Sequence, residues 1–254
     1  MTKTHLQIIG VWASLVLTLS MNYLSNAIPI NGQNAGQVSA KFPTFFTPAG
    51  FAFSIWGIIY LGFIGFAVYQ SLPAQRTSAR VRAARPWVIL NGLLNSAWLP
   101  LFHYELMGVA LVVILALLFT LLKIHEALQT GRESVVSWGE LWLARVPFSI
   151  YLGWICVATV ANASIFLTTT AWSGFGLSDP TWSVVMIGAA TLIAARFYWQ
   201  FADVAFVAVF WWAFWAIYQK QQEVPLVPET ALVGILCLAL LFFAKTTLKV
   251  GRKR

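Results

Sequence analysis

The sequence predicts an all-α, polytopic membrane protein, and three observations lead to this prediction. Of the 254 residues, 59% are hydrophobic and only 9% are charged, whereas an average soluble domain has about 25% charged residues. The apolar residues form uncharged runs close to the length of about 20 residues that a helix needs to cross the hydrocarbon core. Thirteen tryptophans lie mostly inside these runs, where indole rings anchor helices at the headgroup level or stack on flat ligands.

Eight of these runs are predicted to be membrane-spanning helices of one bundle, and the third and seventh are short. They are apolar on every face, unlike the alternating strands of a membrane barrel. The predicted spans are residues 6–28, 49–72, 87–102, 106–127, 140–167, 182–200, 204–220 and 230–248. We expect residues 1–170 to form a five-helix domain and residues 171–254 to add three helices with a basic cytoplasmic tail.

The distribution of positive charge predicts the orientation of the bundle. With eight spans, both termini and the even-numbered loops lie on one side of the membrane, and only Lys41 and Lys220 of the sixteen Lys and Arg residues fall on the other. Because cytoplasmic loops carry the excess of Lys and Arg, we expect both termini to be cytoplasmic, in the plasma (inner) membrane. Topology and contact with membrane lipid therefore explain the net charge of +8, and no nucleic-acid partner is expected.

The first span resembles a signal peptide, because Lys3 precedes an apolar stretch and a small-residue triplet at 25–27. The stretch is long for such a signal and the rest of the chain is already polytopic, so we expect an uncleaved first helix. The polar segment that follows, residues 29–46, ends in aromatic residues and prolines and is predicted to cover the bundle. Cys156 and Cys237 stand alone in separate spans, which indicates neither a disulfide nor a zinc site.

The second and third spans place aromatic rings and an amide inside the bilayer. The second span carries Phe51, Trp56 and Tyr60. In the third span, Asn95 and Trp98 are three residues apart and share a helix face. Because a buried amide needs hydrogen-bond partners, Asn95 is predicted either to join helices or to orient a ligand.

The fifth span carries a continuous stripe of four residues, Tyr151, Trp154, Ala158 and Asn162. Their spacing of three, four and four residues keeps them on one face of a helix. The small side chain of Ala158 between two rings and an amide predicts a recess walled by aromatic side chains. Such a recess suits a flat, hydrophobic ligand.

In these three spans the chain resembles the tryptophan-rich sensory protein or translocator protein family (TspO/MBR). The family's Leu-Asn-x-x-Trp motif matches Leu94, Asn95 and Trp98, and its Met-Gly-x-Ala motif matches residues 107–110. The patterns of its second and fifth helices are matched by Pro48, Phe51, Phe53, Trp56, Tyr60, Tyr151, Leu152, Trp154, Ala158, Thr159 and Asn162. The resemblance covers residues 6–170.

The resemblance implies a five-helix bundle whose first loop closes a pocket for a planar hydrophobic ligand. The ligand would be a tetrapyrrole, a porphyrin or haem, bound for sensing, sequestration or transport, with no cofactor required and with a homodimer as the expected assembly. The implied ligand-binding residues are Phe51, Trp56, Tyr60, Asn95, Trp98, Tyr151, Trp154, Ala158 and Asn162. The chain lacks the family's sterol-type pattern after Asn162, and its last three helices have no counterpart in the compact members, so it resembles a long form.

A secondary transporter of a small amphipathic solute is the alternative, in which Arg196 and Asp203 would pair and couple ion movement. We favour the simpler interpretation that both flank a turn and reach water. The three histidines, His5, His103 and His125, lie near span ends and are expected to be solvated or to cap helices. Glu105 is likewise expected to be solvated. No nucleophile–base pair, phosphate loop or metal cluster is visible, so no enzyme is expected beyond a weak, light-dependent degradation of porphyrin.

Overall fold

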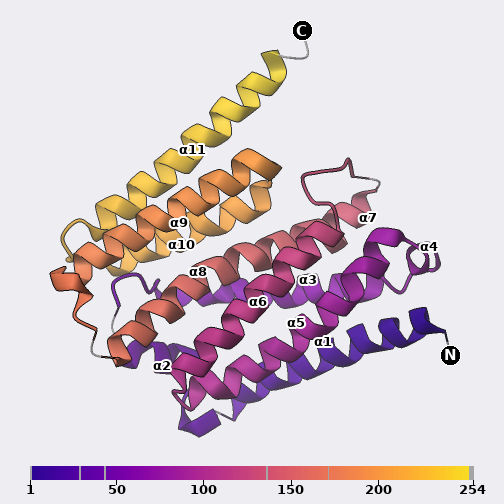
Figure 1. The fold of residues 1–254 in the computed structure, drawn as a ribbon, viewed down its shortest axis with the longest axis horizontal. Coiled ribbons are helices and arrows are strands. Elements are labelled where there is room, and N and C mark those ends of the chain that lie inside the picture. Colours follow the sequence, from indigo (N-terminus) through magenta and orange to yellow (C-terminus); the bar gives the residue numbers. More distant parts are fainter. Residues whose placement is uncertain (1, 29, 43, 136, 171, 252–254) are drawn as a thin grey trace.

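The computed structural model describes residues 2–28, 30–42, 44–135, 137–170 and 172–251, and this part of the chain contains helices and no strand. Each of the eight predicted spans is helical (Figure 1). The long helices are α1 (Lys3–Ala27), α3 (Ile55–Tyr69), α5 (Ala79–His103), α6 (Met107–Ala127), α8 (Val146–Thr169), α9 (Asp179–Phe201), α10 (Val204–Lys220) and α11 (Val227–Gly251).

Short helical segments join or extend the long helices. The connections contain η1 (Ile30–Gly32), α2 (Ala35–Lys41), α4 (Pro73–Arg76) and η4 (Gly174–Gly176). The 3₁₀ helix η2 (Gly50–Ser54) leads directly into α3. The short α7 (Trp138–Glu140) and the π-helical η3 (Leu141–Arg145) lead into α8.

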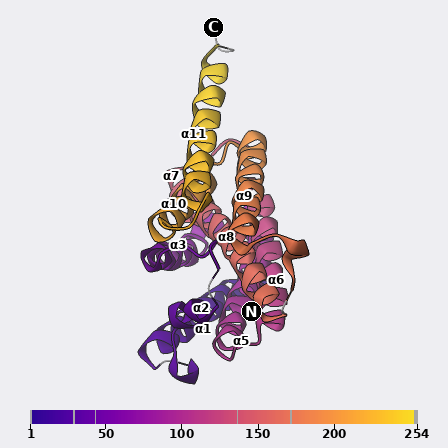
Figure 2. The same ribbon diagram turned by 90° about the vertical axis from the view of Figure 1, so that its left-hand side faces the viewer.

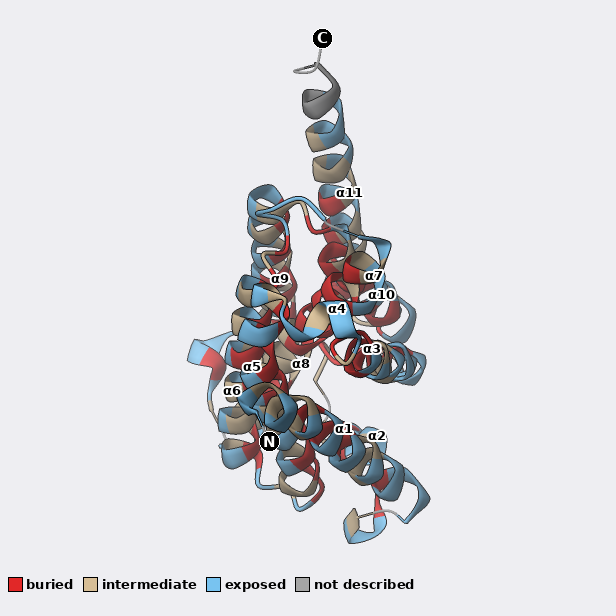
Figure 3. Ribbon diagram, turned by 90° about the vertical axis from the view of Figure 1, so that its right-hand side faces the viewer, coloured by how far each residue is buried: buried red, intermediate tan, exposed pale blue. Residues whose placement is uncertain are grey.

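The protein is an integral membrane protein of the all-α, polytopic class. Six helical stretches of the described chain are long and apolar enough to cross a membrane, and α10 is apolar but has only 17 residues. The outward faces of these helices are exposed, as Figure 3 shows for α1, α3 and α9. They carry apolar residues such as Leu61, Leu192 and Leu240, which is the expected surface where lipid replaces water.

Helix α8 lies at the centre of the bundle (Figure 2). It packs against α3, α6, α9 and α10, while α5 lies between α1 and α6, and α11 packs on α9 and α10. One hydrophobic cluster runs from Val11 of α1 through Trp154 of α8 to Leu238 of α11. The first five long helices and the last three therefore share a single core, with α8 as the common element.

A buried arginine fixes the turn between α3 and α5. The side chain of Arg85 is fully buried and donates hydrogen bonds to the carbonyl oxygens of Gln70 (2.8 Å) and Gln75 (3.2 Å) and to the Gln70 side chain (2.8 Å). The carbonyl groups at the end of a helix lack partners within the helix and carry partial negative charge. Arg85 supplies both the hydrogen bonds and the positive charge at the end of α3.

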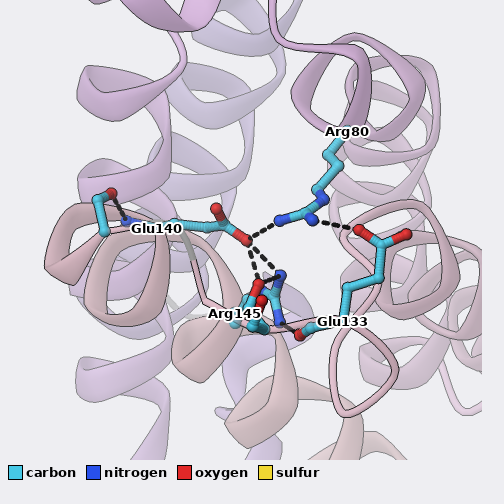
Figure 4. Close-up of polar contacts among 6 residues, drawn as sticks. Arg80, Glu133, Glu140 and Arg145 are labelled. Carbon is cyan, nitrogen blue, oxygen red and sulfur yellow. Dashed lines mark hydrogen bonds and ion pairs between the residues drawn. The ribbon is translucent and has the colours of Figure 1, made fainter.

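Two arginines and two glutamates form an ionic cluster (Figure 4), and α7 and the start of α5, which carry two of them, lie at the same end of the bundle as the N-terminus (Figure 1). Glu140 accepts hydrogen bonds from Arg80 (2.7 Å) and from Nε of Arg145 (2.7 Å), and Arg80 also pairs with Glu133. Arg145 further donates to the Glu133 carbonyl oxygen (2.7 Å). Because Glu140 and Arg145 are buried, the cluster joins the start of α5 to the loop before α8 without leaving a buried charge unpaired.

The turn between α9 and α10 is anchored by a second buried polar cluster. Asp203 accepts hydrogen bonds from Ser149 Oγ (2.5 Å) and from the backbone N–H of Phe206 (3.1 Å), which caps α10, and it lies 3.3 Å from His125 Nε2. The expectations that Asp203 reaches water and that His125 is solvated are wrong, because both are buried. Arg196 is exposed, so Asp203 takes its partners from α6 and α8 and not from Arg196.

The other two histidines differ from each other. His5 is exposed, in agreement with the expected solvation, and its Nδ1 lies 2.6 Å from the hydroxyl of Thr2, the residue that caps α1. His103 is fully buried, and its Nδ1 donates to the Leu99 carbonyl oxygen at 2.7 Å. The expectation of a solvated His103 is wrong, because the segment before α2 covers this end of α5.

We predict that Gly153→Ala destabilises the protein, because a Cβ at Gly153 would lie 2.9 Å from the Phe206 carbonyl oxygen of α10. Overpacking of this kind costs about 1–3 kcal/mol. Gly57→Ala is the matched control, since a Cβ at that position has no neighbour within 4 Å. Thermal unfolding in detergent should show a lower Tm for Gly153→Ala alone; equal Tm values would contradict the close approach of α8 and α10.

We predict that Glu140→Gln lowers the free energy of unfolding by about 3 kcal/mol, because it leaves Arg145 buried with a neutral partner. Glu126→Gln removes an exposed pair with Lys123 and should cost less than about 1 kcal/mol. Denaturant unfolding of both variants tests the difference. A loss for Glu140→Gln no larger than that for Glu126→Gln would show that the cluster of Figure 4 adds no stability.

Candidate ligand-binding site

A cavity of about 360 Å³ lies between α1, α2, η2, α3, α5 and α8. Its wall combines aromatic rings with amides, hydroxyl groups and small residues. The aromatic members are Phe53, Trp56, Tyr60, Trp98, Phe102 and Trp154. The amides and hydroxyl residues are Asn22, Ser25, Asn26, Asn34, Ser39, Thr47, Asn95 and Asn162.

Seven of the nine residues predicted from the sequence lie on this wall, namely Trp56, Tyr60, Asn95, Trp98, Trp154, Ala158 and Asn162. Phe51 does not: it is 44% exposed and packs edge-on against Trp212 of α10. Phe53 lines the cavity in its place, because the 3₁₀ turn of η2 changes which residues face inward. Tyr151 lies behind the wall as the buried partner of Asn95.

A chain of hydrogen bonds fixes the polar side of the cavity. The Tyr60 hydroxyl donates to Asn22 Oδ1, and Asn22 Nδ2 donates to Asn95 Oδ1 at 3.0 Å. Asn95 Nδ2 then donates to the Tyr151 hydroxyl at 2.7 Å. The chain links α3, α1, α5 and α8 and orients both amides. Asn22 is not among the residues predicted from the sequence, although Asn22 and Asn26 lie four residues apart near the end of α1 and so share a helix face.

The aromatic side of the cavity is held by ring packing and by a second amide. Trp56 stacks on Tyr60 with ring centroids 5.6 Å apart and meets Trp154 edge-on at 6.4 Å. Across the cavity, Trp98 donates from Nε1 to Asn162 Oδ1 at 3.3 Å and stacks on Phe102 at 4.6 Å. The rings are therefore positioned before any ligand binds, and flat surfaces of this kind stack on planar molecules.

The cavity wall is electrically neutral. Among the described residues that line it, none is an aspartate, glutamate, lysine, arginine or histidine. The described residues also contain no cluster of three potential metal-binding side chains. Such a wall can accept and donate hydrogen bonds but offers neither a counter-charge nor an imidazole ligand for iron.

Helix α2 covers the cavity, and polar contacts with the turn between α5 and α6 fix its position. A capping box of Asn34 and Gln37 starts the helix. Gln33 Nε2 donates to the His103 carbonyl oxygen and to Glu105, each at 3.0 Å, and Lys41 Nζ lies 2.5 Å from Glu105. Hydrogen bonds from Lys41 and Gln33 lower the pKa of Glu105. Glu105 is partly solvated, as expected, with a side chain that is 35% exposed, and it also pairs with Lys41 and Gln33 of the cover segment.

Comparison with known proteins adds a family-level match. A family model described as TSPO-like protein matches residues 7–244. The match includes α9, α10 and most of α11, which the resemblance seen in the sequence did not reach. No curated protein and no solved structure matches the chain.

We predict that Glu105→Gln loosens the cover without unfolding the bundle. At pH 7 the amides of residues 35–41 should exchange with deuterium several-fold faster, because the ion pair with Lys41 is lost. In the unaltered protein the lowered pKa means that the ion pair is intact above the ordinary glutamate pKa of 4.5 and is lost as the pH falls through the lowered value.

Glu126→Gln, which removes the exposed pair with Lys123, is the control for this exchange measurement. Exchange in α2 that is the same in both variants would show that Glu105 does not hold the cover.

Proposed function

This chain belongs to the TSPO-like protein family, and from that premise we propose that it binds a flat, hydrophobic small molecule in the cavity under α2. The ligand class that we favour is a tetrapyrrole, a porphyrin or haem, bound for sensing, sequestration or transport. We further propose that the protein acts in the plasma (inner) membrane with both termini in the cytoplasm, as its charge distribution favours.

The observation that carries this proposal is the combination of aromatic rings and neutral amides around one partly open cavity. The cavity of about 360 Å³ falls within the range of about 300–1,000 Å³ that small-molecule sites occupy. Trp56, Trp98 and Trp154 offer ring faces from three different helices, and Asn95 and Asn162 offer polar atoms between them. A planar macrocycle could stack on the rings while its polar edge meets the amides.

The neutral wall also restricts how a tetrapyrrole would be oriented. Burial of a carboxylate without a partner costs several kcal/mol, and the described residues of the cavity wall supply no positive charge. The propionate groups of a porphyrin would therefore remain at the mouth, toward the polar residues of α2. Because no histidine is among the described residues of the wall, recognition would depend on the ring faces, with or without iron.

Secondary transport by coupled ion movement has less support. The coupling pair that we considered, Arg196 and Asp203, is not formed, since Asp203 contacts Ser149 and His125. These three groups also lack the arrangement of a hydrolytic triad, because the serine hydroxyl donates to the carboxylate and not to the imidazole. The cavity under α2 remains the best-supported functional element.

We predict that protoporphyrin IX binds the purified protein saturably, with a Kd in the micromolar range, and that Ala158→Leu or Asn95→Ala weakens binding at least tenfold. The leucine would fill the recess between the rings, and loss of the amide would remove a polar contact. Titration in detergent, followed by tryptophan quenching in the dark, measures the affinity. An illuminated parallel sample would reveal any light-dependent loss of the porphyrin.

Ala163→Leu is the matched control, because Ala163 lies on α8 but not on the cavity wall. It should leave the Kd unchanged. A Kd that neither Ala158→Leu nor Asn95→Ala changes would mean that the porphyrin partitions into detergent, and it would contradict the proposal. The dimethyl ester of the porphyrin tests whether the wall lacks a counter-charge for the propionates. Because the ester has no carboxylate to bury, it should bind at least as tightly as the diacid.

A further inference from the structure

A second, smaller pocket lies apart from the cavity, where the C-terminal end of α8 meets the start of α9. Its volume is about 60 Å³. These two helix ends lie at the end of the bundle that carries α2, opposite the N-terminus, as Figure 1 shows, and the pocket lies between them. The residues that line it are Thr44, Phe45, Ser164, Leu167, Thr168, Trp172, Gly174, Asp179, Trp182, Ser183 and Met186. None of these residues belongs to the wall of the large cavity.

Two tryptophans form an aromatic corner of this pocket. The rings of Trp172 and Trp182 lie 4.8 Å apart at 53°, and Phe175 packs edge-on against Trp172 at 5.3 Å. Trp182 donates from Nε1 to the Gly174 carbonyl oxygen at 2.7 Å, which fixes its orientation. Gly174 has φ +63°, and a Cβ there would lie 3.0 Å from Trp182 Nε1, so this close approach requires glycine.

Three hydroxyl groups and one indole N–H of the pocket already donate hydrogen bonds within the protein. The hydroxyl groups of Ser164, Thr168 and Ser183 donate to the backbone carbonyl oxygens of Val160, Ile165 and Asp179, at 2.9, 2.7 and 3.1 Å respectively. The Trp182 N–H is bound to Gly174, as above. These groups therefore present oxygen lone pairs and aromatic faces, which are electron-rich, to anything that enters.

Asp179 adds a negative charge to this electron-rich wall. Within the described part of the chain, no lysine, arginine or histidine lines the pocket, and no ion pair engages the Asp179 carboxylate. The rings, lone pairs and carboxylate all attract positive charge, and none of these groups favours an anion. A cation fits this wall, and aromatic faces bind quaternary ammonium ions through their quadrupoles.

We propose that this pocket binds a quaternary ammonium group. About 15 Å³ of cavity volume accommodates one water, so the 60 Å³ of this pocket corresponds to about four waters. This space suits a cluster of methyl groups around one nitrogen. The ammonium would lie against Trp172 and Trp182 with Asp179 as its counter-charge. This site is independent of the ligand proposed for the large cavity.

Two sources could supply the same chemistry, a free solute such as choline or the head group of a choline phospholipid. The pocket lies at an end of the bundle, where lipid head groups meet transmembrane helices. The recognised group is identical in both cases, and the lipid composition around the protein separates them.

The test is a choline titration by isothermal calorimetry on the full-length protein in nanodiscs of phosphatidylglycerol, which lacks choline. We expect saturable binding that Trp172→Leu and Asp179→Asn each weaken at least tenfold. 3,3-Dimethylbutanol, which replaces the charged nitrogen of choline by carbon, should bind at least tenfold more weakly. Trp142→Leu, an exposed tryptophan remote from the pocket, is the control and should leave choline binding unchanged.

Repetition in nanodiscs of phosphatidylcholine identifies the source. A large loss of apparent choline affinity there would mean that the lipid head group occupies the pocket, and an unchanged affinity would mean that a free solute is the occupant. Equal binding of choline and 3,3-dimethylbutanol would overturn the proposal, as would choline binding unaffected by Asp179→Asn. Asp179 is exposed, so this variant is expected to fold, and circular dichroism checks it. A failed porphyrin titration would not affect this result.

Discussion

The hydrogen-bond chain from Tyr60 through Asn22 and Asn95 to Tyr151 is the constraint on which the large cavity depends. Lipid offers no water to an unpaired amide, and each of these four groups has a hydrogen-bond partner on another helix. The chain thereby fixes the relative positions of α1, α3, α5 and α8. The tryptophans of the cavity lie on three of these same helices, so their spacing follows from the polar contacts. Polar side chains set the shape of a cavity whose wall is largely apolar.

The sequence predicted this arrangement well where a single regular helix carries the signal. On α8 the stripe of Trp154, Ala158 and Asn162 holds its period, and all three residues line the cavity. The prediction failed at Phe51, because η2 is a 3₁₀ helix and the period of an α-helix does not apply there. The spacing of residues in the sequence therefore predicts which side chains face the cavity only where the helix is a regular α-helix.

Contacts between distant segments could not be predicted from one sequence. His125 and Asp203 are 78 residues apart, and neither has a local pattern that points to the other. Their burial follows from the packing of α9 and α10 on the earlier helices, which periodicity alone does not determine. The same packing supports the cavity: the Ala49 N–H donates to the Ala216 carbonyl oxygen at 3.1 Å, and Trp212 donates to that of Ala52 at 3.1 Å. Helix α10 thus holds η2 and the residue before it in place through two hydrogen bonds.

The neutral wall of the cavity has a consequence for the energetics of ligand movement. A membrane potential does about 2.3 kcal/mol of work per elementary charge for each 100 mV, but only on charge that crosses the field. A ligand without ionised groups, such as a porphyrin ester, would carry no net charge into the bilayer, and the described residues of the wall contribute no charge that could move with it. Voltage would then neither drive nor oppose its passage. The direction of any net flux would be set by the concentrations of the ligand on the two sides alone.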